Sequence, residues 1–565
     1  MTAQFKAHEV HEFAGKRLPK ALLTDIPKLL SAYHHDKPDP SVVSERVAFG
    51  TSGHRGSSLE RSFNEDHILA MSQAVCDYRN SRNIEGPLFL GKDTHALSEP
   101  AFENALEVLA ANHVRVIVQE GLGSTPTPVI SHAIITHNGK KTEGLADGII
   151  ITPSHNPPSD GGFKYNPPHG GPAGLEVTQF IEARANQILF EWLRNVKRIP
   201  YEKILRSREI LKQDFVSAYV VDLENVLDMK AIAGAKIKIG VDPLGGAAGD
   251  YWPAIAAHYG LSLDVINHAA NPDFSFLPAD KDGKIRMDCS SPYAMAELIG
   301  RKDDFDIALG NDCDADRHGI VTPAGGLLNP NHYLTLASGY LFQNRPGWDR
   351  NAVIGKSFVT TAMMDRVAAS LGRKVFETPV GFKWFVSKLY DGSCGLAGEE
   401  SGGASFLRKN GRVWTTDKDG ILLGLLACEI LAKTGKDPTL IYKELTSKFG
   451  ASCYGRMDIA TPNLRKNLLQ QFLSTVARSK QIAGEKVTAQ YTHAAGNQEP
   501  IGGIKMTTEN GWFSVRPSGT EALYKIYAES FKGEEHLNQI LNEVRDLMDG
   551  VFLTRRGAGG HNEEQ

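Results

Sequence analysis

The sequence lacks any hydrophobic run long enough to cross a membrane. No stretch of about 18 apolar residues occurs, and the start MTAQFKAHEVHEF has no apolar segment typical of a signal peptide. An excess of one charge is also missing, because 62 lysines and arginines stand against 66 aspartates and glutamates, for a formal net charge of -4. These absences argue against membrane and nucleic-acid binding, and predict a cytoplasmic protein that acts on a small molecule.

Paired cysteines are absent as well. The six cysteines are scattered and form no CxxC motif: Cys76, Cys289, Cys313, Cys394, Cys428 and Cys453. This spacing argues against a disulfide framework and against a cysteine-rich zinc site. It predicts free thiols in a reducing compartment.

The chain has the length and composition of a folded protein with several domains. It has 565 residues, of which 41% are apolar and 23% are charged. That length exceeds what one hydrophobic core serves, so we expect about three or four domains. Polar, turn-rich stretches near 196–210, 322–331 and 435–450 are the candidate linkers, and the tail 555–565 is expected to be disordered.

Apolar runs of strand length recur through most of the chain, each followed by a Gly- or Pro-rich loop and a helical pattern. Such an order is typical of α/β units with buried parallel strands. A helix is expected from Ser98 to about Asn112. The predicted strands are 114–120, 148–152, 236–241, 305–310 and 352–355. Because ligands bind beyond the carboxyl ends of such strands, the loops that open at Thr152 and Asn311 are the expected site.

The pattern changes near the C-terminus. A long apolar helix over 419–434 gives way to strands around WFSV and LYKIYAES, with another helix after Gly533. This order predicts a smaller α+β domain with an antiparallel sheet.

Three carboxylates stand at alternate positions at the end of an apolar strand, at Asp312, Asp314 and Asp316. They can converge on one cation, and Mg²⁺ is favoured because it combines a few carboxylates with a substrate phosphate. The alternatives are a solvated acidic turn and a calcium loop. An EF-hand loop would need glycine and glutamate where Arg317 and Pro323 stand, so that version is excluded.

A serine on a proline-stiffened loop is the second chemical signal. Ser154 lies in the segment 152–158, directly after a predicted strand and beside His155. A serine on a fixed loop within reach of a metal could accept and return a phosphoryl group. Taken alone, the segment is more typical of an ordinary turn.

Two further loops carry polar groups suited to a sugar phosphate. Residues 398–403 (GEESGG) offer carboxylates and a hydroxyl for sugar hydroxyls. Residues 516–520 (RPSGT) offer a guanidinium, two hydroxyls and backbone N–H groups for a phosphate dianion. Either segment alone could be a plain turn.

Five motifs in a fixed order resemble the α-D-phosphohexomutase family, and within it the bacterial members that act on glucose phosphates. They are TSGHRG (51–56), TPSHNPP (152–158), DCDADR (312–317), GEESGG (398–403) and RPSGTE (516–521). The resemblance spans nearly the whole chain. It implies a heart-shaped α/β protein of four domains, with three related α/β domains and a C-terminal α+β domain. The expected bounds are 1–205, 206–325, 326–445 and 446–565.

The resemblance also implies an activity and a set of site residues. Ser154 would carry a phosphoryl group, and glucose 1-phosphate and glucose 6-phosphate would be interconverted through glucose 1,6-bisphosphate, which is also the activator. Mg²⁺ would be bound by Asp312, Asp314, Asp316 and the phosphorylated Ser154. The implied catalytic residues are Ser154, Arg55 and the acid/base candidates His155, Lys164 and Lys418, and the implied substrate-binding residues are Arg317, Gly381, Lys383, Glu399, Ser401, Arg516, Ser518, Gly519 and Thr520.

The sequence departs from the family pattern at two places. Cys313 stands where a glycine is usual, and Val380 stands where some relatives have a hydroxyl residue. The competing interpretations are phosphomannomutase, phosphoglucosamine mutase, and an inactive sugar-phosphate-binding relative. A monomer or homodimer that binds sugar phosphates, without nucleic-acid or membrane partners, is expected.

Overall fold

The computed structural model describes residues 10–50, 52–205, 207–267, 271–460, 476, 479–517 and 523–553. The chain forms two compact units. The larger unit contains residues 10–354 and 381–441, and the smaller one contains residues 355–380 and the chain from 442 onward. The tail 555–565 lies outside the described residues. Within the described ranges, no helix is long and apolar enough to span a membrane.

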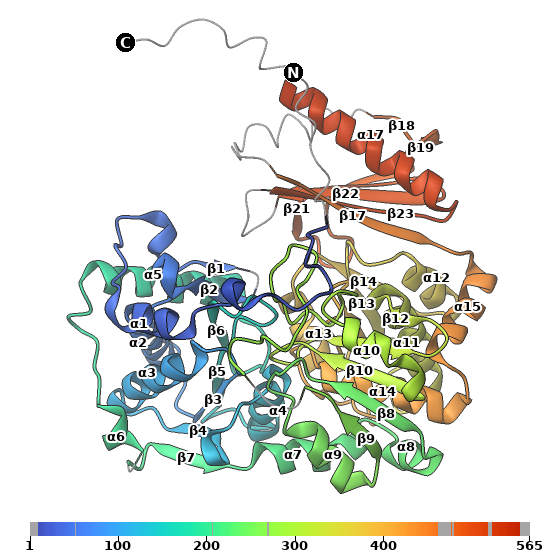
Figure 1. Cartoon of the computed structure of the whole chain (residues 1–565). Helices are drawn as coiled ribbons and strands as arrows, with labels where there is room; N and C mark the ends of the chain where they lie inside the picture. Colours follow the sequence, from blue (N-terminus) through green and yellow to red (C-terminus); the bar gives the residue numbers. More distant parts are fainter. Residues whose placement is uncertain are drawn as a thin grey trace, which may run out of the picture. The chain divides into compact units, whose positions relative to one another are not determined.

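A seven-stranded mixed sheet forms the first part of the larger unit (Figure 1). Its strand order is β1 (Phe49–Gly50), β2 (Gly53–Ser57), β6 (Asp160–Asn166), β5 (Asp147–Ile151), β3 (Leu88–Lys92), β4 (Val116–Gln119) and β7 (Ile210–Gln213). The strands β5, β3, β4 and β7 are parallel, whereas β6, β2 and β1 pair antiparallel. The predicted strands at 114–120 and 148–152 are confirmed.

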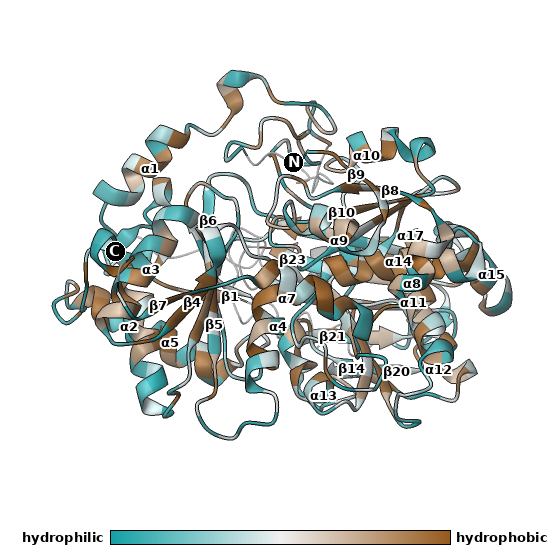
Figure 2. Ribbon diagram, turned by 90° about the horizontal axis from the view of Figure 1, so that it is seen from below, coloured by the Kyte–Doolittle hydropathy of each residue, from teal (hydrophilic) through white to brown (hydrophobic). Residues whose placement is uncertain are grey.

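Helices cover both faces of this sheet (Figure 1). The helices α2 (Glu65–Ser81), α3 (Ser98–Ala111) and α5 (Leu175–Phe190) lie on one side, and α4 (Thr127–Asn138) lies on the other. The predicted helix from Ser98 is therefore confirmed. Figure 2 shows β4 and β5 in brown, because most of their residues are apolar on both faces of a sheet covered by helices.

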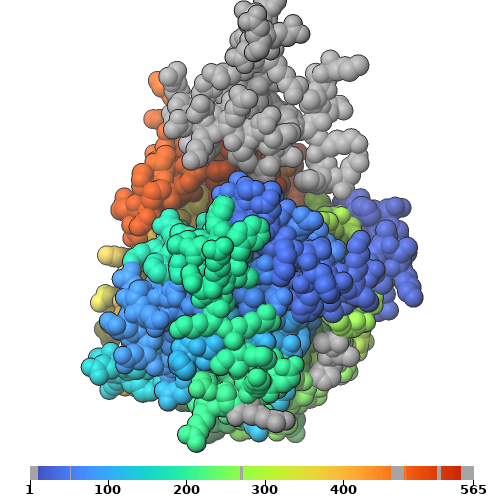
Figure 3. All heavy atoms as spheres, turned by 90° about the vertical axis from the view of Figure 1, so that its left-hand side faces the viewer, coloured from blue at the N-terminus to red at the C-terminus, as the bar shows by residue number. Residues whose placement is uncertain are grey.

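The segment between α5 and β7 returns over the surface of this same region. Figure 3 shows residues of about 175–213, in green, beside the first hundred residues, in blue. The predicted linker 196–210 contains the short helix α6 (Tyr201–Ile204), and β7 then pairs with β4. This stretch thus completes the edge of the first sheet.

A second mixed sheet carries the acidic loop. Its order is β12 (Gly326–Leu328), β11 (His318–Thr322), β10 (Ile307–Asn311), β8 (Lys238–Asp242) and β9 (Ser262–Val265). The strands β10, β8 and β9 are parallel, and β11 and β12 turn back antiparallel. The predicted strands at 236–241 and 305–310 are confirmed, and the predicted linker 322–331 contains β12. Residues 312–317 form the turn between β10 and β11.

The larger unit also contains a hairpin that presents the GEESGG loop. The strands β15 (Cys394–Gly398) and β16 (Ala404–Phe406) pair antiparallel around it. The helices α11 (Pro330–Asn344) and α14 (Gly420–Thr434) follow the acidic loop and this hairpin, respectively. The predicted helix at 419–434 is confirmed as α14.

One predicted linker is a helix. Residues 435–450 contain α15 (Pro438–Phe449). Asp437 Oδ1 accepts the N–H of Thr439 at 2.7 Å, and Pro438 stands at the first helical position, where its missing N–H costs nothing. The cap and the proline made the segment look like a turn, although together they start a helix.

The smaller unit has the antiparallel architecture predicted for the C-terminal part. Its five strands are β17 (Cys453–Ala460), β23 (Leu523–Ser530), β22 (Gly511–Pro517), β21 (Pro500–Thr507) and β20 (Ala489–His493), and α17 (Glu534–Leu553) packs against β17 and β23. All neighbouring strands in this order are antiparallel. Near the start of residues 355–380 lies β13 (Val353–Ser357), the strand expected at 352–355, with β14 (Val375–Thr378) beside it.

Candidate active site

Ser154 lies on the loop that follows β5, in a conformation unusual for serine. Its φ is 59°, in the left-handed region, and its side chain is buried. The Ser154 N–H donates to Thr152 Oγ1 at 2.8 Å. Its Oγ donates to Asp312 Oδ2 at 2.7 Å. The structure therefore places the predicted phosphate carrier directly on the acidic loop.

The three aspartates converge as predicted. The carboxylate groups of Asp312, Asp314 and Asp316 are buried and offer oxygen atoms within 4.8 Å of one another. The loop reverses at Ala315, whose φ is 55°. One buried oxygen each of Asp314 and Asp316 has no hydrogen-bond partner among the described residues. Three hard oxygen donors with free lone pairs fit a divalent cation such as Mg²⁺.

The surroundings of this loop shift the pKa values of Asp312 and Asp316 in opposite directions. Burial, with Asp314 and Asp316 close by, raises the pKa of Asp312 well above its ordinary value. Burial would also raise the pKa of Asp316, but Lys418, Lys164 and Arg317 together hold it well below its usual range. The loop thus concentrates negative charge that a bound cation would stabilise.

Two buried lysines reach the acidic loop from different segments. Lys164 Nζ, on β6, lies 2.5 Å from Asp314 Oδ2 and 3.4 Å from Asp316 Oδ2. Lys418 Nζ, just before α14, lies 2.9 Å from Asp316 Oδ2. Burial works against the charged form of each lysine, but the aspartates hold both lysine pKa values above the ordinary one. Both ammonium groups are therefore charged.

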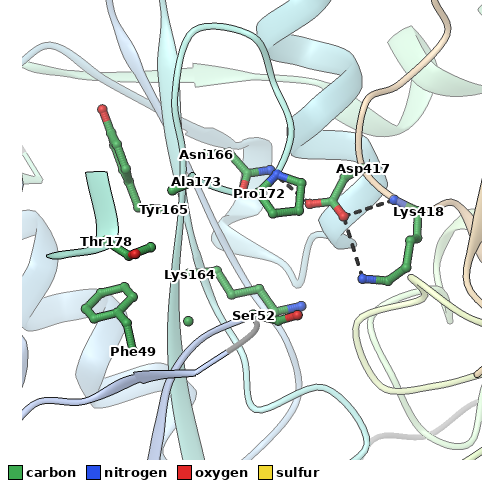
Figure 4. Close-up of a pocket in the computed structure, with 11 residues that line it drawn as sticks. Phe49, Ser52, Lys164, Tyr165, Asn166, Pro172, Ala173, Thr178, Asp417 and Lys418 are labelled. Atoms are coloured by element: carbon green, nitrogen blue, oxygen red, sulfur yellow. Dashed lines mark hydrogen bonds and ion pairs between the residues drawn. The ribbon is translucent and has the colours of Figure 1, made fainter. Parts of the chain in front are cut away.

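The same lysines line a small pocket, drawn in Figure 4. It has a volume of about 20 Å³, enough for about one water molecule. Ser52, Asn166 and Asp417 complete its polar wall. Asn166 Nδ2 donates to Asp417 Oδ2 at 3.1 Å, which fixes the segment that carries Lys418.

Arg55 and His155 lie beside the serine loop. Arg55 Nη1 donates to Asn156 Oδ1 at 2.9 Å. His155 Nδ1 lies 3.4 Å from Ser154 Oγ. Burial, reinforced by the nearby Arg317, lowers the pKa of His155 well below its ordinary value, although Asp288 opposes the shift. Arg317 itself donates its backbone N–H to Asp312 Oδ1 at 3.0 Å.

The GEESGG loop brings Glu399 against the predicted substrate segment. The N–H of Gly381, whose φ is 124°, donates to Glu399 Oε1 at 2.8 Å. Burial, with Glu400 adjacent, raises the pKa of Glu399 to about 7. Lys383 follows in a short helical turn, and burial lowers its pKa. Ser401 is half-buried in the same loop as Glu399.

Gly403 ends that loop against the side chain of Lys418. A Cβ atom built on Gly403 would overlap Lys418 Cδ. The absence of a side chain at position 403 therefore leaves room for Lys418 to extend to Asp316.

The predicted phosphate loop belongs to the smaller unit. Arg516 lies near the end of β22. Ser518, Gly519 and Thr520 lie outside the described residues.

Some residues at the site were missed from the sequence. Thr127, at the start of α4, donates its hydroxyl to Asp314 Oδ2 at 2.5 Å and its N–H to Asp314 O at 2.9 Å. Asp93 and His95 follow β3 and contact the serine loop. The signal for them was available, since β3 is parallel to β5 and both strands end at the same edge of the sheet.

Known families match the chain in four consecutive segments. Residues 46–192, 217–325 and 329–449 match "Phosphoglucomutase/phosphomannomutase, alpha/beta/alpha" domains I, II and III, respectively. Residues 472–547 match the phosphoglucomutase/phosphomannomutase C-terminal domain.

Whole proteins match over nearly the full length. "Phosphoglucomutase" of Komagataeibacter xylinus is 52% identical over 543 residues, covering 96% of this chain and 98% of that protein. "Phosphoglucomutase 1" of Saccharomyces cerevisiae is 28% identical, over 87% and 91% of the two chains. The crystal structure of a putative phosphomannomutase from Thermus thermophilus has a TM-score of 0.71 and 26% identity, over 90% of this chain and all of that one. With all four domains matched and a relative this similar over its whole length, the chain belongs to the phosphoglucomutase/phosphomannomutase family, the α-D-phosphohexomutases.

Proposed function

We propose that the protein is a phosphoglucomutase, which interconverts glucose 1-phosphate and glucose 6-phosphate through a phosphoserine at Ser154 and glucose 1,6-bisphosphate. The observation that carries the proposal is the contact between Ser154 Oγ and Asp312 in the three-aspartate loop. The relative with 52% identity supports glucose phosphates as the substrates.

The acidic loop suits Mg²⁺. Asp312, Asp314 and Asp316 would hold the ion together with a phosphoryl oxygen on Ser154. When bound, the ion would offset the negative charge on the transferring phosphoryl group. Thr127 fixes Asp314, and the backbone N–H of Arg317 fixes Asp312, so the ligand oxygens are held in place beforehand.

The transfer conserves atoms and charge. A free sugar hydroxyl attacks the phosphorus atom, its O–P bond forms as the Ser154 Oγ–P bond breaks, and the hydroxyl proton passes to a base. Ser154 Oγ leaves with the bonding electron pair and takes up a proton. After the bisphosphate reorients, Ser154 Oγ gives up its proton to a base as it attacks the other phosphorus atom, and the released sugar oxygen takes up a proton. The base candidates are His155, Lys164 and Lys418. Of these, His155 contacts Ser154 Oγ, whereas the lysines contact the aspartates, where they would donate to phosphoryl oxygens.

Substrate contacts are proposed for two sets of residues. Glu399 and Ser401, with Gly381 and Lys383, would bind sugar hydroxyls. The non-reacting phosphate would be bound by Arg516, Ser518, Gly519 and Thr520, and Arg317 would support the metal loop or contact a phosphate. Because Gly403 offers no side chain toward the sugar, we propose a preference of roughly ten- to a hundredfold for glucose over mannose and glucosamine phosphates.

The proposed setting is the cytoplasm, where small sugar phosphates are available. We propose that the protein works there as a monomer or homodimer. Sedimentation of the purified full chain measures that state directly.

A coupled assay with glucose 1-phosphate, with and without glucose 1,6-bisphosphate, tests the function. Wild type should form glucose 6-phosphate, and Ser154→Ala should lose activity by several orders of magnitude while it stays folded. Intact mass should show one added phosphate on wild type incubated with the bisphosphate, and none on Ser154→Ala. Faster turnover of mannose 1-phosphate or glucosamine 1-phosphate would favour a sister activity, and no turnover of any of them would favour an inactive binding protein.

A further inference from the structure

Asp93 lies behind the serine loop with both carboxylate oxygens fully engaged. Its Oδ1 accepts from the His95 N–H at 3.0 Å and from Ser98 Oγ at 2.6 Å. Its Oδ2 accepts from Thr152 Oγ1 at 2.6 Å and faces His95 Nδ1 at 2.9 Å. Asp93 and His95 are both buried, so these contacts are shielded from water.

These residues form hydrogen bonds to the serine loop on both sides of Ser154. Before it, Thr152 Oγ1 donates to Asp93 and accepts the N–H of Ser154 at 2.8 Å. After it, His95 Nε2 lies 3.0 Å from the carbonyl oxygen of Asn156. The pair formed by Asp93 and His95 therefore spans the five-residue segment that holds the left-handed serine.

The partners of His95 determine its protonation state. Nδ1 faces a carboxylate that already accepts three other hydrogen bonds, and Nε2 faces a carbonyl oxygen. Both partners can only accept, so both ring nitrogens donate and His95 is an imidazolium. Burial would lower the pKa of His95, but the Asp93 carboxylate raises it well above the ordinary value.

The same cluster reaches the acidic loop. Cys313 Sγ, between two of the aspartates, lies 3.4 Å from His95 Nδ1 and 3.2 Å from Thr94 Oγ1. Thr94 also donates to Gly245 O at 2.8 Å. The cysteine that replaces the usual glycine of this loop thus packs on the Asp93 and His95 pair.

A metal ion is a poorer interpretation of this cluster. Asp93, His95 and Cys313 offer donor atoms within 4.8 Å of one another. A metal needs a deprotonated ring nitrogen, whereas both ring nitrogens of His95 donate hydrogen bonds here. Burial also raises the pKa of the Cys313 thiol to about 11, which disfavours the thiolate ligand.

We propose that Asp93 and His95 are positioning residues for the phosphoryl transfer at Ser154, an inference that rests on the proposed function. They hold the loop at Thr152 and Asn156, so that Ser154 keeps its left-handed backbone and its Oγ stays on Asp312. Serine disfavours that conformation by itself, so the surrounding hydrogen bonds must impose it. Neither residue is proposed to touch the substrate.

The test uses His95→Gln and Asp93→Asn in the full-length enzyme. We expect kcat to fall by about ten- to a hundredfold, with the KM for glucose 1-phosphate within about twofold of wild type, because orientation is lost and substrate contacts are not. Thr152→Val should behave alike, and Thr152→Ser, which keeps the hydroxyl, should recover most of the loss. If kcat is unchanged in the folded variants, the proposal is wrong.

Two matched controls separate positioning from general stability. His132→Gln removes another histidine and aspartate pair of the same unit, in which Nε2 of the buried His132 lies 2.7 Å from Oδ2 of the partly exposed Asp222. Ser98→Ala removes one donor to Asp93 and leaves both contacts to the serine loop. Both controls should lower the melting temperature and leave kcat close to the wild-type value. If they reduce kcat as much as His95→Gln does, the effect is structural and the proposal fails.

A measurement independent of turnover keeps this inference separate from the function. Inactive wild type would overturn the proposed function, whatever the variants do. Crystal structures of wild type and His95→Gln would then still decide the positioning role. We expect Ser154 to leave the left-handed region and to lose its contact with Asp312 in the variant, and an unchanged loop would overturn the proposal.

Discussion

The larger unit contains two clusters of polar groups around buried carboxylates. In one cluster every carboxylate oxygen has a partner, and in the other some oxygens have none. Both oxygens of Glu429, on α14, are occupied: Oε1 by Tyr340 and Arg345 at 2.9 Å each, and Oε2 by Arg345 at 3.0 Å and the Asp228 N–H at 2.8 Å. In the acidic loop, Asp314 and Asp316 each keep a buried oxygen without a hydrogen-bond partner among the described residues. A buried carboxylate with every lone pair used stabilises the fold, whereas an incomplete cluster has capacity left for a ligand.

The largest expected effect on stability comes from a substitution in the Glu429 cluster, whose oxygens all have partners. Arg345→Met leaves the Glu429 carboxylate buried without its cation, which should cost about 3–5 kcal/mol of unfolding free energy. Urea denaturation measures the loss, and kcat of the remaining folded enzyme should stay within about twofold. The double variant Arg345→Met with Glu429→Gln should regain part of the stability. A large fall in kcat at unchanged stability would contradict the comparison.

A substitution in the acidic loop should instead lower kcat and change the stability less. Asp314→Asn removes a charge that balances the cation, so kcat should fall by about a hundredfold or more, about 3 kcal/mol of activation free energy. Stability should fall by less than in Arg345→Met, because one of three crowded negative charges is gone and Lys164, which loses Asp314, keeps Asp316 within 3.4 Å. Asp303→Asn, at a side chain that is 78% exposed, is the matched control and should leave both quantities near wild type. Severe destabilisation by Asp314→Asn would show that this cluster, too, is structural.

Removal and addition of Mg²⁺ test whether the acidic loop binds a metal and the Glu429 cluster does not. Excess EDTA should abolish activity, and Mg²⁺ should restore it. At a Mg²⁺ concentration a hundredfold above Kd, unfolding of wild type should become harder by about 2.7 kcal/mol. Arg345→Met should keep this stabilisation and Asp316→Asn should lose most of it. Activity that persists in EDTA would exclude the metal assignment.

The smallest expected effect concerns a third kind of buried carboxylate, one with neutral partners only. Asp242 accepts from the Leu244 N–H at 2.8 Å and from Asn267 Nδ2 at 3.0 Å, and burial raises its pKa to about 7. The folded protein therefore keeps this proton to a higher pH than the unfolded chain does. The resulting stability is present below about pH 4 and is lost as the pH rises toward 7.

The measurement compares wild type with Asp242→Asn, which cannot titrate there. Between pH 5 and pH 7.5 the unfolding free energy of wild type should fall relative to the variant, by about 2.5 kcal/mol. Parallel pH profiles of the two proteins would show that Asp242 keeps an ordinary pKa.

Much of the site could be predicted from local sequence. The acidic loop and Ser154 each follow an apolar strand, and strand ends share an edge of the sheet, so their meeting was expected. Asp93 and His95 also follow such a strand but were missed, because their role depends on hydrogen bonds to residues about 60 positions away. The antiparallel strands β2 and β6 were missed because glycines replace the expected apolar residues there.

The overlap between Gly403 and Lys418 has a consequence for how this enzyme can evolve. A side chain at position 403 and an extended lysine at position 418 would occupy the same space, so position 403 cannot gain a side chain while Lys418 stays extended. Lys418 would have to shorten or turn away before a larger residue appears at 403, and in doing so it would give up Asp316. Across divergent chains with this fold we therefore expect the two positions to covary, with a glycine at one accompanying a long cationic residue at the other.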